Sequence, residues 1–479
     1  MKRLRWYDLI THNIYFLGLS IGAAALTPII TPVLVQQYAG GDLKNTMYGL
    51  LRACGLAVAV VVQPAAGLLS DRSTARWGRR RPFIAVGALL SALCVLGIGV
   101  AGGYWPLFAA MLLLQFASNI AQGALQAVIP DLVPEDQRGR AAAVKAIMEL
   151  LPVVLVAFTV GHWVAAGQIT LAISAVGASY VVTMLIQVAG MRETPLQVKP
   201  AGSVREPLLR SLGLLVGLAL GALVGAVAGV LVGGLAGLVT IALAGREVAW
   251  LVGVGAGGLA AVVTAIVAGV WAAVQIGADA RKYPAFTWWV VNRLLYLAAV
   301  GSIQGFALYF LQDVMRVPDP AKVTGNLMMV VGICTLVSAL PSGYLSDRLG
   351  RRGLVALTGV VAAAGTGLIL VAGSVPVVLA GGCLIGLATG AFMATNWALG
   401  TDLVPAAEAG RFLGVSNLAG AGAGIMGAGI GGPLADYFNR THPGLGYLVV
   451  FGIYGVCFLL STVSLTQVKL RVPAATATE

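Results

Sequence analysis

The sequence is poor in charged residues. Only 10% of its 479 residues are Asp, Glu, Lys or Arg, whereas 59% are hydrophobic. A soluble domain carries about a quarter charged residues, so a soluble enzyme of this size could not cover its surface. A disordered chain is excluded for the opposite reason, because so much apolar chain does not stay in water. The composition indicates an all-α protein that crosses a membrane many times.

Several motifs are also missing. The chain has no Walker loop, nucleophile elbow, dinucleotide motif or metal-ligand cluster, so we expect no cofactor, no metal, no ATP-driven step and no enzymatic activity. The net charge of +12 is explained by basic loops that set membrane orientation, and no nucleic-acid partner is expected. The few cysteines each lie in an apolar run and read as small core residues rather than a disulfide framework. They are Cys54, Cys94, Cys334, Cys383 and Cys457.

Long apolar runs are what the chain has in abundance. A helix needs ~20 apolar residues to cross the bilayer core. Twelve runs reach this length, and they are given at the end of this paragraph. In addition, an apolar block at 211–274, interrupted only at 244–247, predicts two more helices or a re-entrant pair, for about fourteen helices in all. No clear small-residue cleavage site comes after the first run, so this run is interpreted as a span rather than a signal peptide. Twelve runs meet the length criterion outright: 11–34, 47–70, 83–103, 106–129, 143–165, 169–190, 287–311, 323–345, 353–373, 376–400, 412–434 and 445–467.

Basic residues predict the orientation. If the N-terminus is cytoplasmic and the spans alternate, 23 Lys and Arg residues lie inside, 5 lie outside and 2 lie within spans. This asymmetry favours a multi-pass protein of the cell membrane with both termini in the cytoplasm. An odd number of crossings in the block at 211–274 would weaken the bias, so the block is expected to cross twice or not at all.

The chain repeats itself. Residues 67–83 resemble 343–353, and residues 131–144 resemble 402–415. Gly78 pairs with Gly350 at an offset of 272, and Asp131 with Asp402 at an offset of 271. We therefore predict a six-helix bundle in each half, and two similar bundles that rock against each other are typical of transporters. The predicted division is 1–195 for the first bundle, 196–285 for a linker that contains the inserted two-helix hairpin, and 286–479 for the second bundle.

The repeated loops carry a family resemblance. GLLSDRSTARWGRRRPF at 67–83 and GYLSDRLGRRG at 343–353 resemble the loop signature of the major facilitator superfamily. The stretches at 49–72, 292–314 and 396–405 are similar to its branch of cation-coupled sugar symporters, which holds the glycoside-pentoside-hexuronide and sucrose-type carriers. The extra hairpin departs from the usual twelve-helix plan.

The resemblance implies a secondary transporter that works by alternating access. The expected partners are a small polar solute such as a sugar or glycoside, a coupling cation (a proton, or else sodium) and the lipid bilayer, and a monomer is expected. Two alternatives stay open. One is a drug or metabolite exporter of the same fold, which an acidic, aromatic-lined cavity would favour. The other is a non-transporting membrane assembly factor or sensor.

The resemblance also implies a conformational gate in the basic loops, where an Asp at a helix end pairs with arginines. The alternative is that these arginines only set topology, and that Asp131 and Asp402 only cap helices. The first gate set is Asp71, Arg72, Gly78, Arg79, Arg80, Asp347, Arg348, Gly350, Arg351 and Arg352. The second set, with an intracellular charge-relay role, is Asp131, Arg140, Asp402 and Arg411.

Polar residues inside the spans are candidates for substrate binding. Asn119, Gln122 and Gln126 follow each other at spacings of three and four, so they share one helix face. A polar stripe in lipid is expected to face protein or a water-filled cavity, although hydrogen bonds between helices would also explain it. Arg52 and Arg293 lie within spans and could instead be structural. The remaining candidates are Arg293, Tyr296, Gln304, Asn396 and Trp397.

Coupling to protons needs an acid within the membrane, and the spans contain very few. Glu149 is the candidate, and Lys145, four residues earlier on the same helix face, is its expected partner. Burial would raise the pKa of such a Glu and a nearby cation would lower it, so a contact that changes with conformation could load and release a proton.

The inserted block carries glycine at every fourth position. Each four-residue step turns ~40° beyond a full circle, so we expect the stripe to serve more than one neighbour or the helix to bend. We predict a scaffold role with no chemistry. The seven glycines are Gly213, Gly217, Gly221, Gly225, Gly229, Gly233 and Gly237.

Overall fold

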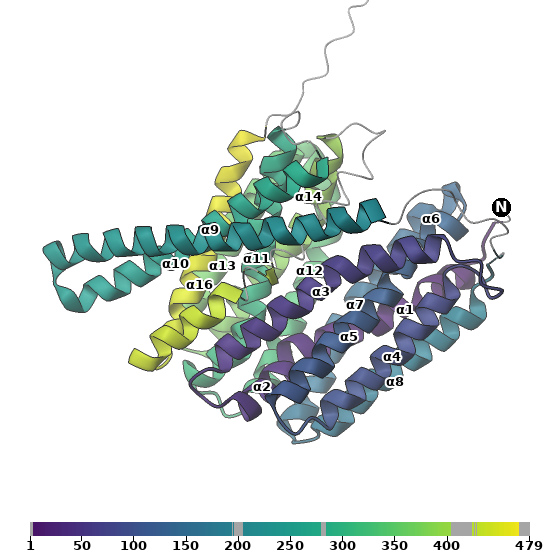
Figure 1. The fold of residues 1–479 in the computed structure, drawn as a ribbon, viewed down its shortest axis with the longest axis horizontal. Coiled ribbons are helices and arrows are strands. Elements are labelled where there is room, and N and C mark those ends of the chain that lie inside the picture. The colour runs from purple at the N-terminus through teal and green to yellow at the C-terminus, as the bar shows by residue number, and fades with distance from the viewer. Residues whose placement is uncertain are drawn as a thin grey trace, which may run out of the picture.

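The computed structural model describes residues 3–193, 195, 205–278, 284–403, 424–425, 427 and 429–468. Within these residues the chain forms helices joined by short loops (Figure 1), and 13 of the helices are long and apolar enough to cross a membrane. The prediction of an all-α membrane protein is confirmed. The predicted span at 412–434 lies largely outside the described residues, which are helical from 429 to 441.

The N-terminal part of the chain forms one group of helices, here called the N-half. The helices α1, α3, α4, α5, α7 and α8 pack side by side in it. Its elements are α1 Trp6–Ala25, η1 Leu26–Ile30, α2 Thr31–Ala39, α3 Lys44–Asp71, α4 Arg81–Gly99, α5 Tyr104–Leu125, α6 Val128–Leu132, η2 Glu135–Gln137, α7 Arg138–Ala165 and α8 Ile169–Gly190.

A second group, the C-half, follows residue 284. The helices α11, α12, α13, α14 and α16 pack together in it, and α12 also lies along α7 of the N-half. Its elements are α11 Pro284–Asp313, α12 Pro320–Leu349, α13 Arg351–Leu370, α14 Val375–Asp402, the helical residues 429–441, α16 Leu445–Ser464 and η5 Leu465–Gln467. The exact domain boundaries stay a prediction.

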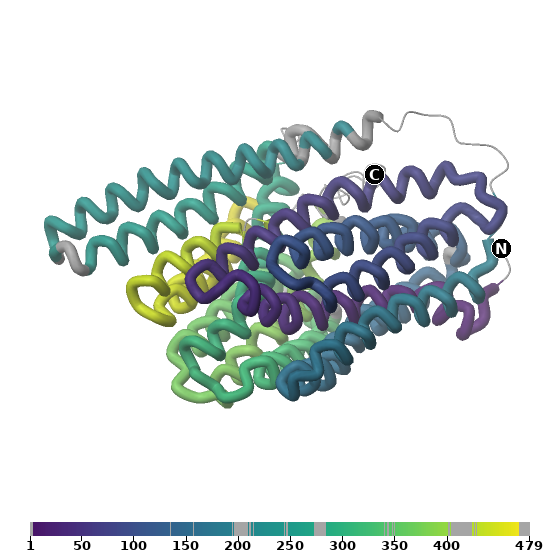
Figure 2. Tube along the Cα trace, turned by 60° about the horizontal axis from the view of Figure 1, so that its bottom comes forward, coloured from purple at the N-terminus to yellow at the C-terminus, as the bar shows by residue number. Residues whose placement is uncertain are grey.

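The inserted block forms two antiparallel helices, α9 Arg205–Ala244 and α10 Arg246–Ala278, as predicted. The hairpin packs on α3, α11 and α16, and its turn extends beyond the other helices (Figures 1 and 2). The helix α9 has 40 residues. At the usual helical rise it measures about 60 Å, which is longer than a bilayer core.

The glycine stripe of α9 lies against the backbone of α10. A Cβ added at Gly225, Gly229 or Gly233 would come within 2.5, 2.8 and 2.6 Å of carbonyl oxygens of α10, and one at Gly221 within 2.5 Å of Gly269. The sequence predicts either several neighbours or a bent helix, and these four glycines all face one neighbour, α10, which leaves the second alternative. Because the stripe rotates around α9, the two helices must wind around each other or bend to keep this contact.

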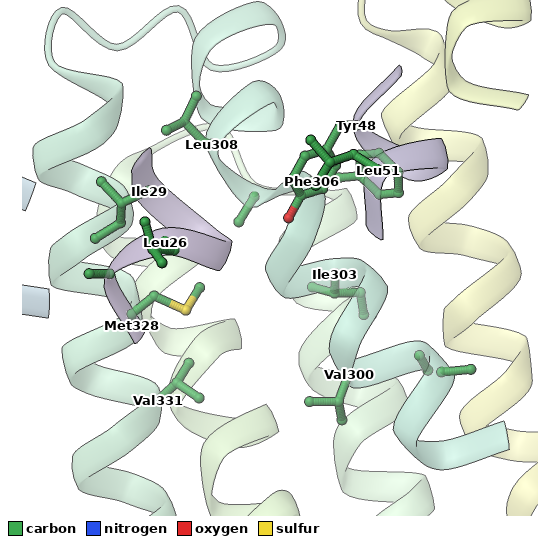
Figure 3. Packing of buried hydrophobic residues seen from close by; sticks show 14 of the residues in the cluster. Leu26, Ile29, Tyr48, Leu51, Val300, Ile303, Phe306, Leu308, Met328 and Val331 are labelled. Carbon is green, nitrogen blue, oxygen red and sulfur yellow. The ribbon is translucent and has the colours of Figure 1, made fainter. Parts of the chain in front are cut away.

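The halves meet through apolar side chains. Tyr48 and Leu51 of α3 lie beside Phe306 of α11, and Leu26 and Ile29 lie near Met328 of α12 (Figure 3). The rings of Tyr48 and Phe306 meet edge to face, with their centroids 6.0 Å apart. Such aromatic pairs add about 0.5–1.5 kcal/mol beyond the burial of their area, so this contact stabilises the observed arrangement of the halves.

We predict opposite effects from two neighbouring glycines. Gly233→Ala should separate α9 from α10, because its Cβ meets the Gly253 carbonyl oxygen, and should cost about 1–3 kcal/mol. Gly234→Ala meets nothing within 4 Å. It should be neutral or stabilise by up to about 1 kcal/mol, since Ala favours helix. Thermal unfolding of the purified proteins measures both. Equal effects of the two substitutions would contradict the close contact.

Candidate functional site

A cavity of about 360 Å³ lies where the two halves meet. Helices of both halves line this central cavity, and its polar groups are Ser20, Thr27, Glu149 and Gln304. Gln304 comes from α11, whereas the other three come from the N-half. The apolar remainder is Ala23, Ala24, Pro28, Val153, Met328 and Val331. Of the predicted substrate residues, the structure therefore places Gln304 in this cavity.

An adjoining cavity of about 220 Å³ lies inside the N-half and shares Ser20, Thr27 and Glu149 with the central one. Its polar wall is one face of α5, formed by Gln115, Ser118, Asn119 and Gln122, with Tyr180 opposite from α8.

The polar face of α5 agrees with the predicted stripe at two of its three residues, Asn119 and Gln122. The third, Gln126, follows the end of α5, and its Oε1 accepts a hydrogen bond from Lys145 Nζ at 3.0 Å. Sequence reasoning missed Gln115, although it precedes Asn119 by four residues and so extends the same helix face.

A π-helical turn, η1, positions Thr27 and Pro28 at the cavity. The N–H of Thr31 bonds to the Leu26 carbonyl oxygen, and Pro32 has no N–H for the carbonyl of Thr27. Tyr48 of α3 supplies the missing donor, with its hydroxyl 2.9 Å from the Thr27 oxygen. Single π turns are frequent at functional sites, and Thr27 and Pro28 of this turn line the central cavity.

Glu149 is the one acid among the described residues that line these cavities. Its carboxylate lies 3.6 Å from Lys145 Nζ, and the Glu149 side chain is 40% exposed. The Lys145 ammonium also lies over the ring of Phe16, 4.6 Å from its centroid. The structure therefore contains the predicted pair. Glu149 is about 17 Å from the start of α7 at the usual helical rise, and Lys145 is one turn closer to that end.

Polar contacts join the halves at one end of α3, here called the Lys44 side. Lys44 Nζ lies 2.7 Å from Asp313 Oδ2 at the end of α11, and the Tyr447 hydroxyl donates to the same carboxylate at 2.6 Å. Both side chains of the ion pair are largely buried. Removal of one partner from a buried pair costs about 3–5 kcal/mol. The pair therefore holds the halves together on this side.

A second carboxylate reinforces the Lys44 side. Asp436 accepts hydrogen bonds from the backbone N–H of Thr46 at 2.6 Å and of Asn45 at 3.3 Å, and from Asn45 Nδ2 at 2.8 Å. These N–H groups belong to the first turn of α3, which has no partner for them within the helix and carries partial positive charge. We call Lys44, Asn45, Asp313, Asp436 and Tyr447 the Lys44 cluster.

Glycine at position 432 lets the second carboxylate come close. A Cβ there would lie 2.3 Å from the Asn45 carbonyl oxygen. Because real Cβ atoms essentially never approach so near, a larger residue would push the helix at 429–441 away from α3. The close approach and the Lys44 cluster together join the two halves on the Lys44 side.

A different cluster lies at the other end of α3, about 40 Å away at the usual helical rise. The guanidinium of Arg80, 2% exposed, pairs with both Asp71 and Asp131, and its Nη2 lies 2.8 Å from Asp131. Arg79 lies 2.6 Å from the second oxygen of Asp131. The structure thus brings together four predicted gate residues, all within the N-half.

Sequence reasoning missed Glu193, which completes the Arg80 cluster. Its carboxylate accepts the backbone N–H of Arg80 at 2.9 Å and of Arg81 at 3.2 Å, at the start of α4. Gly78 has φ +110°, and a Cβ there would lie 2.2 Å from Glu193 Oε2. Glycine in the motif therefore permits both the turn and the approach of Glu193.

The other predicted gate residues are less connected. Gly350 has φ +74° and joins α12 to α13, Arg348 lies over Tyr344, and Arg351 donates to the Ala398 carbonyl at 3.1 Å. The described contacts include no ion pair for Arg72, Arg140 or Arg352. The side chains of Asp347 and Asp402, and all of Arg411, lie outside the described residues.

The remaining substrate candidates do not line the described cavities. Arg293 donates to Asn396 Oδ1 at 3.0 Å and lies 5.3 Å from the Trp397 ring centroid. Tyr296 is fully buried and stacks on Phe392, with centroids 3.7 Å apart. Arg52, considered structural, lines a small cavity of about 80 Å³ beside Thr31 and Gln115.

Many apolar spans around a cavity shared by two helix groups define a polytopic membrane protein of the kind that carries solutes. The family model of the Major Facilitator Superfamily matches residues 13–325 and 298–478. The chain belongs to this superfamily, and the predicted resemblance is confirmed.

Curated relatives resemble part of the chain. The Arabidopsis thaliana sucrose transport protein SUC3 is 32% identical over 156 residues, which are 26% of this chain and 24% of that protein. The Homo sapiens proton-associated sugar transporter A is 32% identical over 146 residues, 27% of this chain and 19% of that protein. The chain thus spans about a quarter or less of the length of these relatives. Both are named as transporters and not as enzymes, which agrees with the prediction.

Solved structures share the fold along nearly the whole chain. A peptide transporter POT in complex with sulfate has a TM-score of 0.68 at 14% identity, over 97% of this chain and 96% of that one. The nucleoside transporter NupG has a TM-score of 0.65 at 12% identity, over 96% and 98%. At such low identity these likenesses establish the fold alone.

We predict that the two carboxylates bound to Arg80 differ in role. Asp131→Asn removes two ion pairs and should cost about 3–5 kcal/mol, because it leaves Arg80 buried with less counter-charge. Asp71 is 48% exposed. Asp71→Asn should therefore change stability by about 1 kcal/mol or less and act instead on the balance between conformations. Thermal unfolding compares both with Arg140→Gln, an exposed control. Equal destabilisation by the two Asn substitutions would contradict this division.

We also predict that the Lys44–Asp313 pair keeps its side closed. Lys44→Asp or Asp313→Lys should place like charges together and lengthen the distance between spin labels at positions 42 and 319, measured by double electron–electron resonance in a cysteine-free background. The double exchange should restore most of the short distance. Lys322→Asp reverses an exposed charge at the same end and is the control. Unchanged distances in both single variants would show that the pair does not hold this side.

Proposed function

We propose that the protein is a secondary active transporter that moves a small polar solute, a sugar or glycoside, across the cell membrane together with protons. The observation that carries this proposal is the central cavity, which both halves line, while the Lys44 cluster joins the halves at one end of α3. A site enclosed between two movable helix groups is what alternating access requires.

The walls of the cavities support a hydroxyl-rich solute. Gln115, Asn119, Gln122 and Gln304 supply amides, and Ser20 and Thr27 supply hydroxyls. The central cavity has a volume of about 360 Å³. This volume falls within the range of about 300–1,000 Å³ usual for small-molecule sites. Relatives named for sucrose transport and for proton-associated sugar transport point in the same direction.

Glu149 supports coupling to protons. A neutral, protonated Glu149 needs no counter-charge in the cavity, whereas the ionised form is stabilised by Lys145. Lys145 on α7 and Tyr180 on α8 are the titratable side chains that the described residues place around it. The neighbouring walls from α1, α5, α11 and α12 offer only neutral side chains among the described residues. A change in the Lys145–Glu149 contact between conformations would therefore take up or release a proton.

The bias of basic residues assigns the Lys44 side to the outside and both termini to the cytoplasm. With that orientation the structure is the state closed to the outside. The Lys44 cluster is then the outer gate, and the Arg80 cluster, with its repeat counterpart at Asp347, Arg348, Gly350, Arg351, Arg352 and Asp402, is the inner one.

We predict that Glu149→Gln separates transport from coupling. In proteoliposomes, an inward pH gradient should drive accumulation of a labelled sugar by the wild type and not by Glu149→Gln. Exchange of the same sugar at equal concentration on both sides should survive, because the cavity keeps its shape and polarity. The assay would use a panel of neutral sugars, sucrose included, and sugar acids.

Asp319→Asn, which neutralises an exposed acid far from the cavity, is the matched control and should accumulate sugar like the wild type. Accumulation by Glu149→Gln at the wild-type level would eliminate Glu149 as the coupling site. Failure of the wild type to exchange any sugar on the panel would overturn the proposed function.

A further inference from the structure

Arg293 is a buried cation for which the described residues supply no carboxylate. It lies in α11, an apolar span, and is 9% exposed. The described ion pairs include none for Arg293, in contrast to Arg80, which is also buried and has two carboxylates. A charge inside a membrane span is costly and is usually paired or functional. The positive charge of Arg293 therefore requires an explanation.

The surroundings of Arg293 are built to hold the guanidinium in place. One nitrogen, Nη1, donates to Asn396 Oδ1 at 3.0 Å. The Asn396 amide is itself oriented, because its Nδ2 donates to Asn292 Oδ1 at 2.9 Å, and Asn292 donates to the Ser461 carbonyl oxygen at 2.8 Å. This chain of amides crosses from α14 through α11 to α16 and fixes the amide oxygen toward Arg293.

Aromatic rings complete the enclosure. The Arg293 guanidinium carbon lies 5.3 Å from the centroid of Trp397 and 6.0 Å from that of Trp289. The Trp289 indole N–H is in turn fixed by the Asn396 carbonyl oxygen at 2.9 Å. The electron-rich ring faces offset part of the cost of the buried charge, but they are neutral and do not neutralise it.

The part of the chain that the structure describes places no acceptor at one edge of the guanidinium. Nε is buried without a hydrogen-bond partner, and the described hydrogen bonds include none from Nη2. Nε and Nη2 point in parallel along this edge and match the two oxygens of a carboxylate. The group that would satisfy both the charge and the free edge is an anion with two oxygens side by side.

The position of Arg293 fits a role in the passage of a solute. Gln304, which lines the central cavity, follows Arg293 by eleven residues on α11. Eleven residues make about three turns, so both side chains lie on the same face of the helix. Arg293 is about 16 Å from Gln304 toward the start of α11, at the end of the helix opposite Asp313 and the Lys44 side.

We propose that Arg293 is an anion-recognition site for the transported solute, and that this solute is a sugar acid whose carboxylate binds the Nε–Nη2 edge. The identity of the anion as cargo rests on the proposed transport function. The existence of the site rests only on the guanidinium, which is buried, oriented and without a carboxylate partner among the residues described.

The test uses the purified protein in nanodiscs of neutral phosphatidylcholine, with glucuronate and glucose as matched probes in calorimetric titrations. Glucuronate should bind about tenfold or more tightly than glucose, since a charge-assisted pair is the difference. Asn396→Asp supplies an internal carboxylate of nearly the same shape and should abolish that preference. Arg293→Lys keeps the charge but loses the two-donor edge, and should also weaken glucuronate binding about tenfold. Arg440→Gln, an exposed arginine, is the control and should bind like the wild type.

Equal binding of glucuronate and glucose by the wild type would overturn the proposal, and so would glucuronate binding that neither variant weakens. A third arm contains nanodiscs with phosphatidylglycerol. If this lipid alone raises the thermal stability of the wild type but not of Asn396→Asp, the counter-ion is a lipid headgroup and the proposal is wrong. Chloride or phosphate that competes as well as glucuronate would also overturn it, because the site would then hold a general anion.

The transport assay separates this inference from the proposed function. One outcome is that the pH gradient drives accumulation of neutral sugars equally in the wild type and in Asn396→Asp, while the wild type does not bind glucuronate. This outcome would overturn the inference and leave the carrier function intact. Binding of glucuronate that depends on Arg293, without accumulation of any solute, would overturn the carrier function and leave the site intact.

Discussion

The bilayer offers no partners for polar groups, and this constraint governs the rest of the structure. Backbone hydrogen bonds must close within each helix, which explains why the described chain is helical. Polar side chains must then find each other or a cavity, and they gather in four places. These are the cavity walls, the Lys44 cluster, the Arg80 cluster and the surroundings of Arg293.

Much of the fold follows from the sequence because apolar length and the repeated loop motif are local signals. The predicted spans agree with the helices to within a few residues in most cases, and the hairpin at 211–274 is among them. For the glycine stripe the sequence leaves two alternatives open, several neighbours or a bent helix, and four of its glycines face a single neighbour. Once α9 and α10 wind or bend, a stripe that rotates around one helix can follow a single partner.

The site is predictable only in part, for physical reasons. A face such as that of Asn119 and Gln122 is set by helical periodicity, and the Lys145–Glu149 pair by a spacing of four. Contacts between residues far apart in the sequence have no such local rule. Nothing in the spacing of Asp313 and Asp436 indicates that both meet the first turn of α3, and Glu193 meets the start of α4 across more than a hundred residues. Gln126 and Asn396 are polar residues near or within spans, as predicted, but their hydrogen bonds direct them to protein groups rather than to the described cavities.

The helix α3 takes part in one polar cluster at each end, so a movement of the helix would affect both clusters together. Lys44 and Asn45 are bound to the C-half, whereas Asp71, about 40 Å away, is bound to Arg80 of the N-half. A rotation of α3 about its middle would move its two ends in opposite directions. Breaking the contacts of one cluster and changing those of the other would then be a single movement. Tyr48, one turn from Lys44, links the same helix to the Thr27 carbonyl at the cavity wall. In the proposed transport cycle, the stiffness of α3, which Pro64 near its Asp71 end reduces, would set how tightly the movements of its two ends are coupled.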